Sequence, residues 1–264
     1  MDRMKAAVIQ LDIAEGKPEA NRKRAELLIE KAAAIEPDVI LLPEMWTTGY
    51  ELDKLEQICD REGRPTLDMI SRLAEKHGVN IIAGSFADMG KAGGIRNTSY
   101  VVDRKGNTIA QYEKIHLFKL MGEHTSLKAG GKYCTFEIDG VRCGLIICYD
   151  LRFPELVRTL ALEGIQVLFV PAEWPGKRLM HWSTLLKARA IENQIFVVAA
   201  NRAGKGEGDV FAGGSVVIDP WGEVLAEADF REQIISAGIE LGKVKEIRSH
   251  MDILGDRVPE TYRL

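Results

Sequence analysis

Six short, mostly apolar runs, separated by longer segments of helical character, constrain the fold of this 264-residue chain more than any other feature. The runs are residues 6–11, 39–42, 79–84, 141–147, 166–170 and 195–200. Runs this short predict strands that are buried on both faces, as in sheets flanked by helices. The spacing of apolar residues between the runs predicts amphipathic helices at 18–35, 66–77, 154–163 and 180–193. The chain is therefore expected to be an α/β protein.

A second pattern interrupts this alternation and occurs twice. Asp103 and Asp219 each begin a turn that reaches a glycine three residues later, and β-like residues flank both turns. The pattern predicts two hairpins and indicates two equivalent halves, although a coincidence of common Asp-x-x-Gly turns is an alternative. With the helical segments, the hairpins favour two sheets packed face to face, each covered by helices. Residues 90–94 and 203–208 are expected to be exposed, mobile loops.

Composition argues against several classes of protein. The formal net charge is −4 and the isoelectric point is about 5.8, so charge does not favour binding to nucleic acid or to an anionic membrane. No apolar run approaches the roughly 20 residues of a membrane span, and no export signal precedes the first run. The four cysteines lack CxxC spacing, which argues against a zinc site. We therefore expect a cytoplasmic protein with reduced thiols and no metal.

Three residues with reactive side chains each follow a strand-like run. Glu44 follows the second run after one proline, Lys114 follows the first predicted hairpin, and Cys148 follows the fourth run. Layered α/β folds carry catalytic groups on short loops at strand ends. A thiol between a strand and a helix stands where enzymes place nucleophiles, and such positions can lower the pKa of the thiol. Taken singly, the three residues also fit a helix-end carboxylate, a surface lysine and a small buried hydrophobe.

The segments around these residues resemble the three signature blocks of the nitrilase superfamily, the carbon–nitrogen hydrolases with a Glu-Lys-Cys triad. The blocks are Leu42-Pro43-Glu44-Met45-Trp46, Tyr112-Glu113-Lys114-Ile115-His116-Leu117-Phe118 and Ile147-Cys148-Tyr149-Asp150-Leu151-Arg152-Phe153-Pro154-Glu155. Segments 46–50, 172–175 and 188–194 resemble the ω-amidase-like branch, particularly its bacterial members linked to methionine salvage. The resemblance implies a single carbon–nitrogen hydrolase domain over residues 1–264. Its expected fold is a four-layer αββα sandwich with a C-terminal arm at about 243–264.

The resemblance also implies catalytic roles. Cys148 attacks the carbonyl carbon of an amide, while Glu44 takes the thiol proton, passes it to the departing ammonia and then activates the water that cleaves the thioester. Lys114 favours the thiolate and the oxyanion, and the backbone N–H of Tyr149 completes an oxyanion hole. Glu123 falls where family members carry a second glutamate that positions the substrate or the triad. No cofactor is expected.

The expected substrate is a small linear amide, in particular an ω-amide of a dicarboxylate such as 2-oxoglutaramate. The free carboxylate of such a substrate needs a cationic or hydroxyl partner. Arg178 and Tyr50 are the candidates, and Trp174 walls the pocket or packs. Alternatives with the same triad are a nitrile, an N-carbamoyl amino acid or deaminated glutathione as substrate. A Cys–His hydrolase and a catalytically silent binding protein on this fold are further alternatives.

Other residues near the triad are expected to be structural. Arg152 is expected to brace its loop by pairing with a carboxylate, and His116 and His181 are expected to make structural hydrogen bonds. Cys143 lies five residues before Cys148, an odd step along a strand, so it is expected to point the opposite way and to be inert.

The expected assembly is a homodimer or a higher homo-oligomer. The resemblance implies pairing across a helical face, and two-fold pairing is common among soluble proteins. The sequence supplies apolar residues on the predicted helix 154–163 and in the C-terminal arm, namely Leu156, Val157, Leu160, Leu162, Val258, Tyr262 and Leu264.

Overall fold

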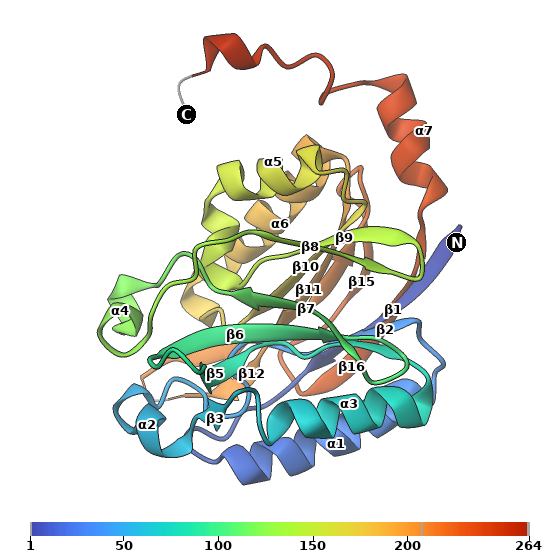
Figure 1. Ribbon diagram of the computed structural model, residues 1–264. Helices are drawn as coiled ribbons and strands as arrows, with labels where there is room; N and C mark the ends of the chain where they lie inside the picture. Colours follow the sequence, from blue (N-terminus) through green and yellow to red (C-terminus); the bar gives the residue numbers. More distant parts are fainter. Residues whose placement is uncertain (1, 207, 263–264) are drawn as a thin grey trace.

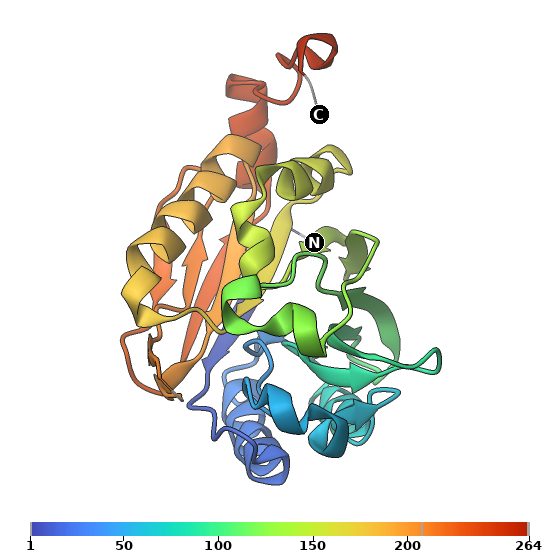
Figure 2. The same ribbon diagram turned by 90° about the vertical axis from the view of Figure 1, so that its left-hand side faces the viewer.

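The computed structural model describes residues 2–206 and 208–262, which fold into four layers (Figure 1). Helices α1 (Pro18–Ala33) and α3 (Thr66–His77) cover one face of a larger sheet, whose other face packs against a smaller sheet. Helices α5 (Pro154–Leu162) and α6 (Leu179–Asn193) lie side by side over the far face of the smaller sheet (Figure 2). The predicted α/β class and αββα sandwich are confirmed.

Both sheets mix parallel and antiparallel strands. The larger sheet has the order β16 (Gln233–Glu240), β1 (Arg3–Gln10), β2 (Val39–Leu41), β4 (Asn80–Ile82), β6 (Ile95–Val102), β5 (Phe86–Met89) and β3 (Asp60–Arg61), and β7 (Thr108–Glu113) also pairs with β6. The smaller sheet has the order β15 (Val224–Glu227), β14 (Val216–Ile218), β11 (Phe196–Asn201), β10 (Val167–Ala172), β9 (Val141–Leu145) and β8 (Cys134–Ile138). A separate hairpin joins β12 (Ala203–Lys205) to β13 (Val210–Ala212), and the short helices are α2 (Leu55–Ile58) and α4 (Glu123–Ser126).

Burial on both faces explains the apolar runs. Successive side chains of β1 point to opposite sides of the larger sheet. Ala6 and Val8 pack between the two sheets, whereas Ala7 and Ile9 pack in the layer beneath α1 and α3. All four side chains are fully buried. A strand in this position has no solvent face, so no polar alternation marks it in the sequence.

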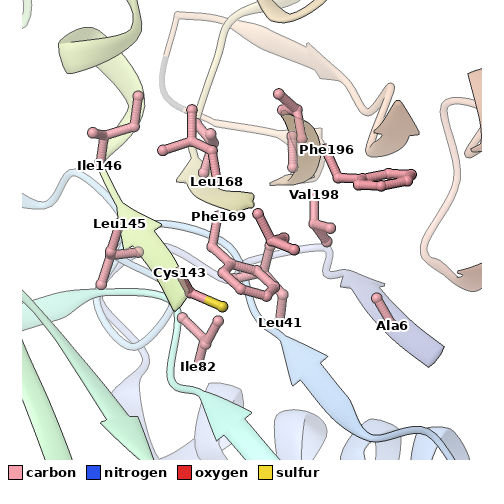
Figure 3. Packing of buried hydrophobic residues seen from close by; sticks show 14 of the residues in the cluster. Ala6, Leu41, Ile82, Cys143, Leu145, Ile146, Leu168, Phe169, Phe196 and Val198 are labelled. Carbon is pink, nitrogen blue, oxygen red and sulfur yellow. The ribbon is translucent and has the colours of Figure 1, made fainter. Parts of the chain in front are cut away.

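The core between the sheets also contains one of the free thiols. Figure 3 shows Leu41 and Ile82 of the larger sheet beneath Cys143 and Phe169 of the smaller sheet. Cys143 is fully buried, and burial raises the pKa of its thiol well above the ordinary range. Burial, and the raised pKa that it causes, is therefore the reason to expect the Cys143 thiol to be inert. The prediction for Cys143 rested on side chains alternating along one strand as far as Cys148. That alternation does not reach Cys148, because β9 ends at Leu145 and Cys148 lies on a separate turn.

The two predicted hairpins, β6–β7 and β14–β15, have the same turn. Oδ1 of the first aspartate accepts the N–H groups two and four residues later, at 2.9 and 2.9 Å for Asp103 and at 2.9 and 3.0 Å for Asp219. In both turns the backbone N–H of the aspartate donates to the carbonyl four residues later at 2.9 Å. Each hairpin follows a parallel pair of strands in a different sheet, β2–β4 in the larger and β10–β11 in the smaller, and this matching order supports the internal repeat.

Most predicted boundaries shift by one to three residues, and two of the differences have a clear local cause. The first helix ends at Ala33 instead of residue 35, because the chain turns there and Glu36 has a positive φ of 51°. The segment 203–208 is not simply a mobile loop, since its first half forms β12 and pairs with β13. The guanidinium of Arg202 lies 4.1 Å from the ring centre of Phe211 and packs this hairpin against the body.

The C-terminal segment extends away from the four layers. It contains α7 (Gly242–His250) and then an irregular arm that lies beyond α5 (Figures 1 and 2). Val258 and Tyr262 of this arm are exposed, whereas Leu264 lies outside the described residues. Among the helices of the described segments, none is long and apolar enough to cross a membrane.

Candidate active site

Glu44, Lys114 and Cys148 come together where the chain leaves strands of the two sheets. Glu44 follows β2 and Lys114 follows β7 in the larger sheet, and Cys148 begins a 3-10 turn (Cys148–Arg152) after β9 of the smaller sheet. The Glu44 N–H donates to the carbonyl of Ala172 in β10 at 3.3 Å, which joins the two sheets at this point. The three residues have relative exposures of 0%, 1% and 7%, so the site is almost closed to solvent.

Lys114 lies between two carboxylates. Its Nζ is 2.8 Å from Oε1 of Glu44 and 2.6 Å from Oε1 of Glu123. Burial opposes the charge of Lys114, but the two carboxylates outweigh burial and raise its pKa well above the ordinary value. The Tyr50 hydroxyl is 3.0 Å from Glu44 and 2.5 Å from Glu123, and the Phe118 N–H donates to Glu123 at 2.7 Å. Lys114 is therefore a charged group held by two fixed acceptors.

Glu44 is fixed by two more donors. The amide nitrogen of Asn97, on β6, donates to Oε1 of Glu44 at 2.8 Å, and the backbone N–H of Glu173 donates to Oε2 at 2.8 Å. Asn97 was not predicted, because nothing in its local sequence distinguishes it from other strand residues. These bonds hold the carboxylate in one orientation.

Cys148 stands on a strained turn that a buried aspartate holds in place. Its φ is +47°, a conformation rare for residues other than glycine and often found at functional sites. Asp150 accepts hydrogen bonds from the Ile147 N–H at 3.0 Å, the Tyr112 hydroxyl at 2.7 Å and the His116 N–H at 3.0 Å. The His116 ring nitrogen Nδ1 lies 2.8 Å from the same carboxylate. The predicted structural hydrogen bond of His116 is thus confirmed, whereas the role of Asp150 was missed.

The thiol is the resting form of Cys148. Burial raises its pKa well above the ordinary value, the neighbouring Glu44 carboxylate raises it further, and Lys114 lowers it by less. The expectation that this position lowers the pKa of the thiol is wrong for the unliganded site. The physical reason is that the charge of Lys114 is shared between two carboxylates in a dry environment. A base must therefore take the thiol proton, and Glu44 is the neighbouring candidate.

A small cleft leads to the thiol. Its cavity volume is about 10 Å³, and it is lined by Tyr50, Lys114, Phe118, Met121, Cys148, Tyr149, Arg152, Glu173, Trp174, Pro175 and Arg178. The four residues predicted to contact substrate, Tyr50, Tyr149, Trp174 and Arg178, all lie in this lining. Within residues 2–206 and 208–262, no group of three or more His, Cys, Asp or Glu residues is placed to hold a metal ion.

Two guanidinium groups of the cleft face no carboxylate. Arg152 lies 4.6 Å from the ring centre of Trp174, and Arg178 lies 5.2 Å from that of Phe118. Neither makes an ion pair with any described residue. Burial lowers the pKa of Arg152, and the positive charge of Arg178 also lowers it. The prediction that Arg152 pairs with a carboxylate is wrong, because it stacks on Trp174 and contacts the ring of His181 at 3.3 Å.

A second buried ion cluster lies beside the first. Arg202 pairs with Glu173, and its Nη1 lies 3.2 Å from Glu15. Burial raises the pKa of Glu173 to about 8 although Arg202 opposes this shift. Sequence reasoning missed both residues. A signal was present, because Glu173 follows a strand and a proline much as Glu44 does.

Comparison with known proteins places the chain among enzymes of one family. The model of the carbon-nitrogen hydrolase family matches residues 5–249. The 2-oxoglutaramate amidase of Bacillus subtilis (strain 168) is 47% identical over 96% of this chain and 97% of that protein. The omega-amidase NIT2 of Homo sapiens is 32% identical over 99% of this chain and 98% of its own. The structure of XC1258 from Xanthomonas campestris, a CN-hydrolase superfamily protein with an arsenic adduct in its active site, superposes with a TM-score of 0.92 at 30% identity, covering 100% of both chains.

Proposed function

This chain belongs to the carbon–nitrogen hydrolase family, and on that premise we propose that it is a cysteine-dependent amidase acting on an ω-amide of a small dicarboxylate such as 2-oxoglutaramate. The observation that carries the proposal is one cleft that combines a buried thiol with two guanidinium groups lacking a carboxylate. The names of the relatives support the same class of substrate. The small volume of the cleft favours a short substrate over a peptide.

Acylation begins with proton transfer from Cys148 to Glu44. The sulfur attacks the amide carbon, a C–S bond forms, and the carbonyl oxygen becomes an oxyanion. The ammonium of Lys114 and the backbone N–H of Tyr149 stabilise this charge, and removal of one such donor typically costs about 10²–10³ in rate. Collapse of the intermediate breaks the C–N bond, and Glu44 returns the proton to the leaving nitrogen. The products are ammonia and a thioester on Cys148.

Deacylation uses the same base. Glu44 takes a proton from water, the hydroxide attacks the thioester, and the second oxyanion forms at the same donors. Its collapse releases the carboxylate and returns the proton to sulfur. Glu123 contributes to these reaction steps through Lys114. Its Oε1 lies 2.6 Å from Nζ of Lys114 and holds the ammonium in place opposite Glu44. The Tyr50 hydroxyl bonds both carboxylates, so its role is to space them rather than to bind the substrate carboxylate.

Arg152 and Arg178 form the subsite for the free carboxylate of the substrate. Both side chains line the cleft, and the positive charge of Arg178 lowers the pKa of Arg152, so the two charges lie near each other. An anion placed between them relieves this repulsion and gains charge-assisted hydrogen bonds. Trp174 and Tyr149 provide the apolar walls along which the short carbon chain lies.

An ammonia assay across a substrate panel tests this proposal. The panel contains 2-oxoglutaramate, glutaramate, succinamate, an N-carbamoyl amino acid, a nitrile and the neutral amide propionamide. We expect the highest kcat/KM for the dicarboxylate monoamides and a much lower value for propionamide. Higher efficiency on the nitrile or the N-carbamoyl amino acid would reject the substrate class but keep the triad. Absence of ammonia release from every member would favour a silent binding protein.

We further propose a homodimer formed across α5, α6 and the C-terminal arm, although part of the predicted surface needs correction. Val157 and Leu160 are fully buried in the core and are not available for an interface. Leu162 of α5 and Met180 and Ile191 of α6 are exposed at 50%, 68% and 43%, so these helices still carry exposed apolar side chains. Sedimentation at micromolar concentration tests the dimer, with a strictly monomeric active enzyme as the contrary result. The cytoplasmic location stays a prediction, and the cysteines are free thiols as a reducing compartment leaves them.

A further inference from the structure

One carboxylate oxygen of Glu173 takes no part in the proposed acylation and deacylation steps. The residue is 1% exposed and lines the cleft together with Cys148. One carboxylate oxygen, Oε1, pairs with Arg202. The other, Oε2, is buried and finds no hydrogen-bond partner among the described residues. A carboxylate oxygen taken out of water without a donor is costly, so a donor absent from the unliganded protein is expected to occupy this place.

Glu173 lies beside the atoms that react. Its backbone N–H donates to Oε2 of Glu44 at 2.8 Å. The same N–H also lowers the pKa of the Cys148 thiol through a hydrogen bond. The Glu44 carboxylate also raises the pKa of Glu173, so the carboxyl group of Glu173 lies close enough to the base to interact with it.

The protein donors of this region are already engaged. Lys114 and Tyr50 both bond the carboxylates of Glu44 and Glu123. A primary amide brings one acceptor, its carbonyl oxygen, and two N–H donors. The carbonyl is matched by the oxyanion donors, and the N–H groups need acceptors. Glu173 lines the cleft, and its buried Oε2 is an acceptor to which no described residue donates.

We infer that Glu173 accepts an N–H of the substrate amide through Oε2 and thereby selects primary amides over esters and N-alkyl amides. This inference rests on the proposed amidase function. Arg202 holds the other oxygen and so fixes the carboxylate in the orientation that leaves Oε2 free. An ester carries no N–H for this oxygen, and an N-methyl group would bring carbon against a desolvated carboxylate.

The test compares two substrates that form the same acyl-enzyme. 2-Oxoglutaramate and the 5-methyl ester of 2-oxoglutarate differ only in the leaving group, so hydrolysis of the thioester is common to both. We compare kcat/KM for each in the wild type and in Glu173→Gln. Glutamine keeps an oxygen for Arg202 and places an NH₂ group where Oε2 stood. The ratio of the two values within one preparation is independent of how much of the variant is folded.

At pH 9, above the pKa of about 8 to which burial raises Glu173, we expect Glu173→Gln to lower kcat/KM for the amide by about ten- to a hundredfold, the loss typical of a hydrogen bond to a charged group, with the ester value changed less than about threefold. Glu15→Gln serves as the matched control, because it removes the other carboxylate of Arg202 without altering the cleft lining. The control should keep the wild-type ratio.

Two results overturn the inference separately from the proposed function. Equal losses on amide and ester would mean that Glu173 only supports Glu44, and an unchanged amide value would mean that Oε2 does not meet the substrate. A wild-type enzyme that cleaves the ester but not the amide would instead reject the amidase function, and the inference with it.

Discussion

Two buried cations of this protein have almost the same surroundings, but Lys114 lines the cleft and Arg202 does not. Lys114 and Arg202 have relative exposures of 1% and 0%, and each lies between two carboxylates. Lys114 follows a strand of the larger sheet, whereas Arg202 lies between β11 and β12 beside the smaller sheet. The difference lies in their other contacts. Arg202 also donates to backbone carbonyls, among them that of Ile13 at 2.8 Å, whereas Lys114 lines the cleft.

The chemistry of the two side chains explains this division. A guanidinium presents several donors in a fixed plane and can tie a carboxylate and a loop together. An ammonium is a compact charge that can serve carboxylates and a developing oxyanion from one point. The comparison teaches that charge and burial alone do not identify a catalytic cation. What identifies such a cation is its position relative to the nucleophile.

The largest expected effect comes from breaking the catalytic cluster. Cys148→Ala should lower kcat by about 10⁴-fold or more, and Lys114→Met or Glu44→Gln should each cost several orders of magnitude. The double variants should lose little more than Cys148→Ala alone, because the three residues act as one unit. Steady-state ammonia release measures all of them, and multiplicative losses would contradict a shared mechanism. Retained circular dichroism controls for folding.

Breaking the second cluster should affect stability first. Arg202→Met leaves Glu173 and Glu15 without their cation, and loss of one partner of a buried pair typically costs about 3–5 kcal/mol in free energy of unfolding. Urea denaturation measures this cost. Arg24→Met is the matched control, since it removes a half-exposed pair with Glu232 and should cost no more than about 1 kcal/mol. Equal effects of the two variants would remove the structural role given to Arg202.

Arg178, which makes no ion pair with a described residue, is a third cation to compare with Lys114 and Arg202. Arg178→Met should raise KM for a dicarboxylate monoamide by about ten- to a hundredfold and leave propionamide unaffected, because only the former carries a carboxylate. Its free energy of unfolding should change by about 1 kcal/mol at most, since only a ring contact with Phe118 is lost. Proportional losses on both amides would show that Arg178 does not bind the carboxylate.

The smallest expected effect is a change with pH. Burial raises the pKa of Glu173 from 4.5 to about 8. Below this value the carboxyl group is protonated, and a proton on Oε2 repels an amide N–H, whereas above it the ionised oxygen accepts one. The amide-to-ester ratio of kcat/KM should therefore rise by about tenfold from about pH 6.5 to 9 in the wild type and stay flat in Glu173→Gln. A flat wild-type ratio would disagree with the role proposed for Oε2.

The rate of alkylation distinguishes the proposed nucleophile from the other thiols of the chain. Cys134 and Cys143 are buried and burial raises their pKa values, so the partly exposed Cys59 is the competitor of Cys148 for iodoacetamide. Burial raises the pKa of Cys148 as well, but its neighbour Glu44 can take the thiol proton. We expect Cys148 to be labelled first and its labelling rate to fall in Glu44→Gln, while the rate at Cys59 stays constant. Peptide mapping after partial labelling measures both. Dominant labelling of Cys59 in the wild type would contradict an activated Cys148.

Local sequence patterns could reveal most of the layers and the triad. The apolar runs mark strands buried on both faces, as β1 shows, and the Asp-x-x-Gly pattern marks both hairpins because its hydrogen bonds span only four residues. Glu44, Lys114 and Cys148 were found because each follows a strand in a distinctive segment. Glu123 was placed by the resemblance, and the structure sets it against Lys114.

Long-range contacts were beyond sequence reasoning. The positive φ of Cys148 and the hydrogen bonds to Asp150 depend on Tyr112 and His116, which reach the turn from another strand end. Arg152 looked like a partner for a carboxylate, yet the packing of Trp174 places it in the cleft. The pKa of Cys148 is raised rather than lowered because dehydration and the sharing of Lys114 are properties of the assembled site.

The sequence by itself determined which segments become strands and helices and which side chains are the candidates for the chemistry, because hydrophobic period and turn chemistry act over a few residues. Only the tertiary structure decided which charges neighbour which. It paired Lys114 with Glu44 and Glu123, paired Arg202 with Glu173, and left Arg152 and Arg178 without a carboxylate. The physical reason is that Coulomb interactions and desolvation depend on distance in space and on burial, and neither is encoded in the spacing of residues along the chain.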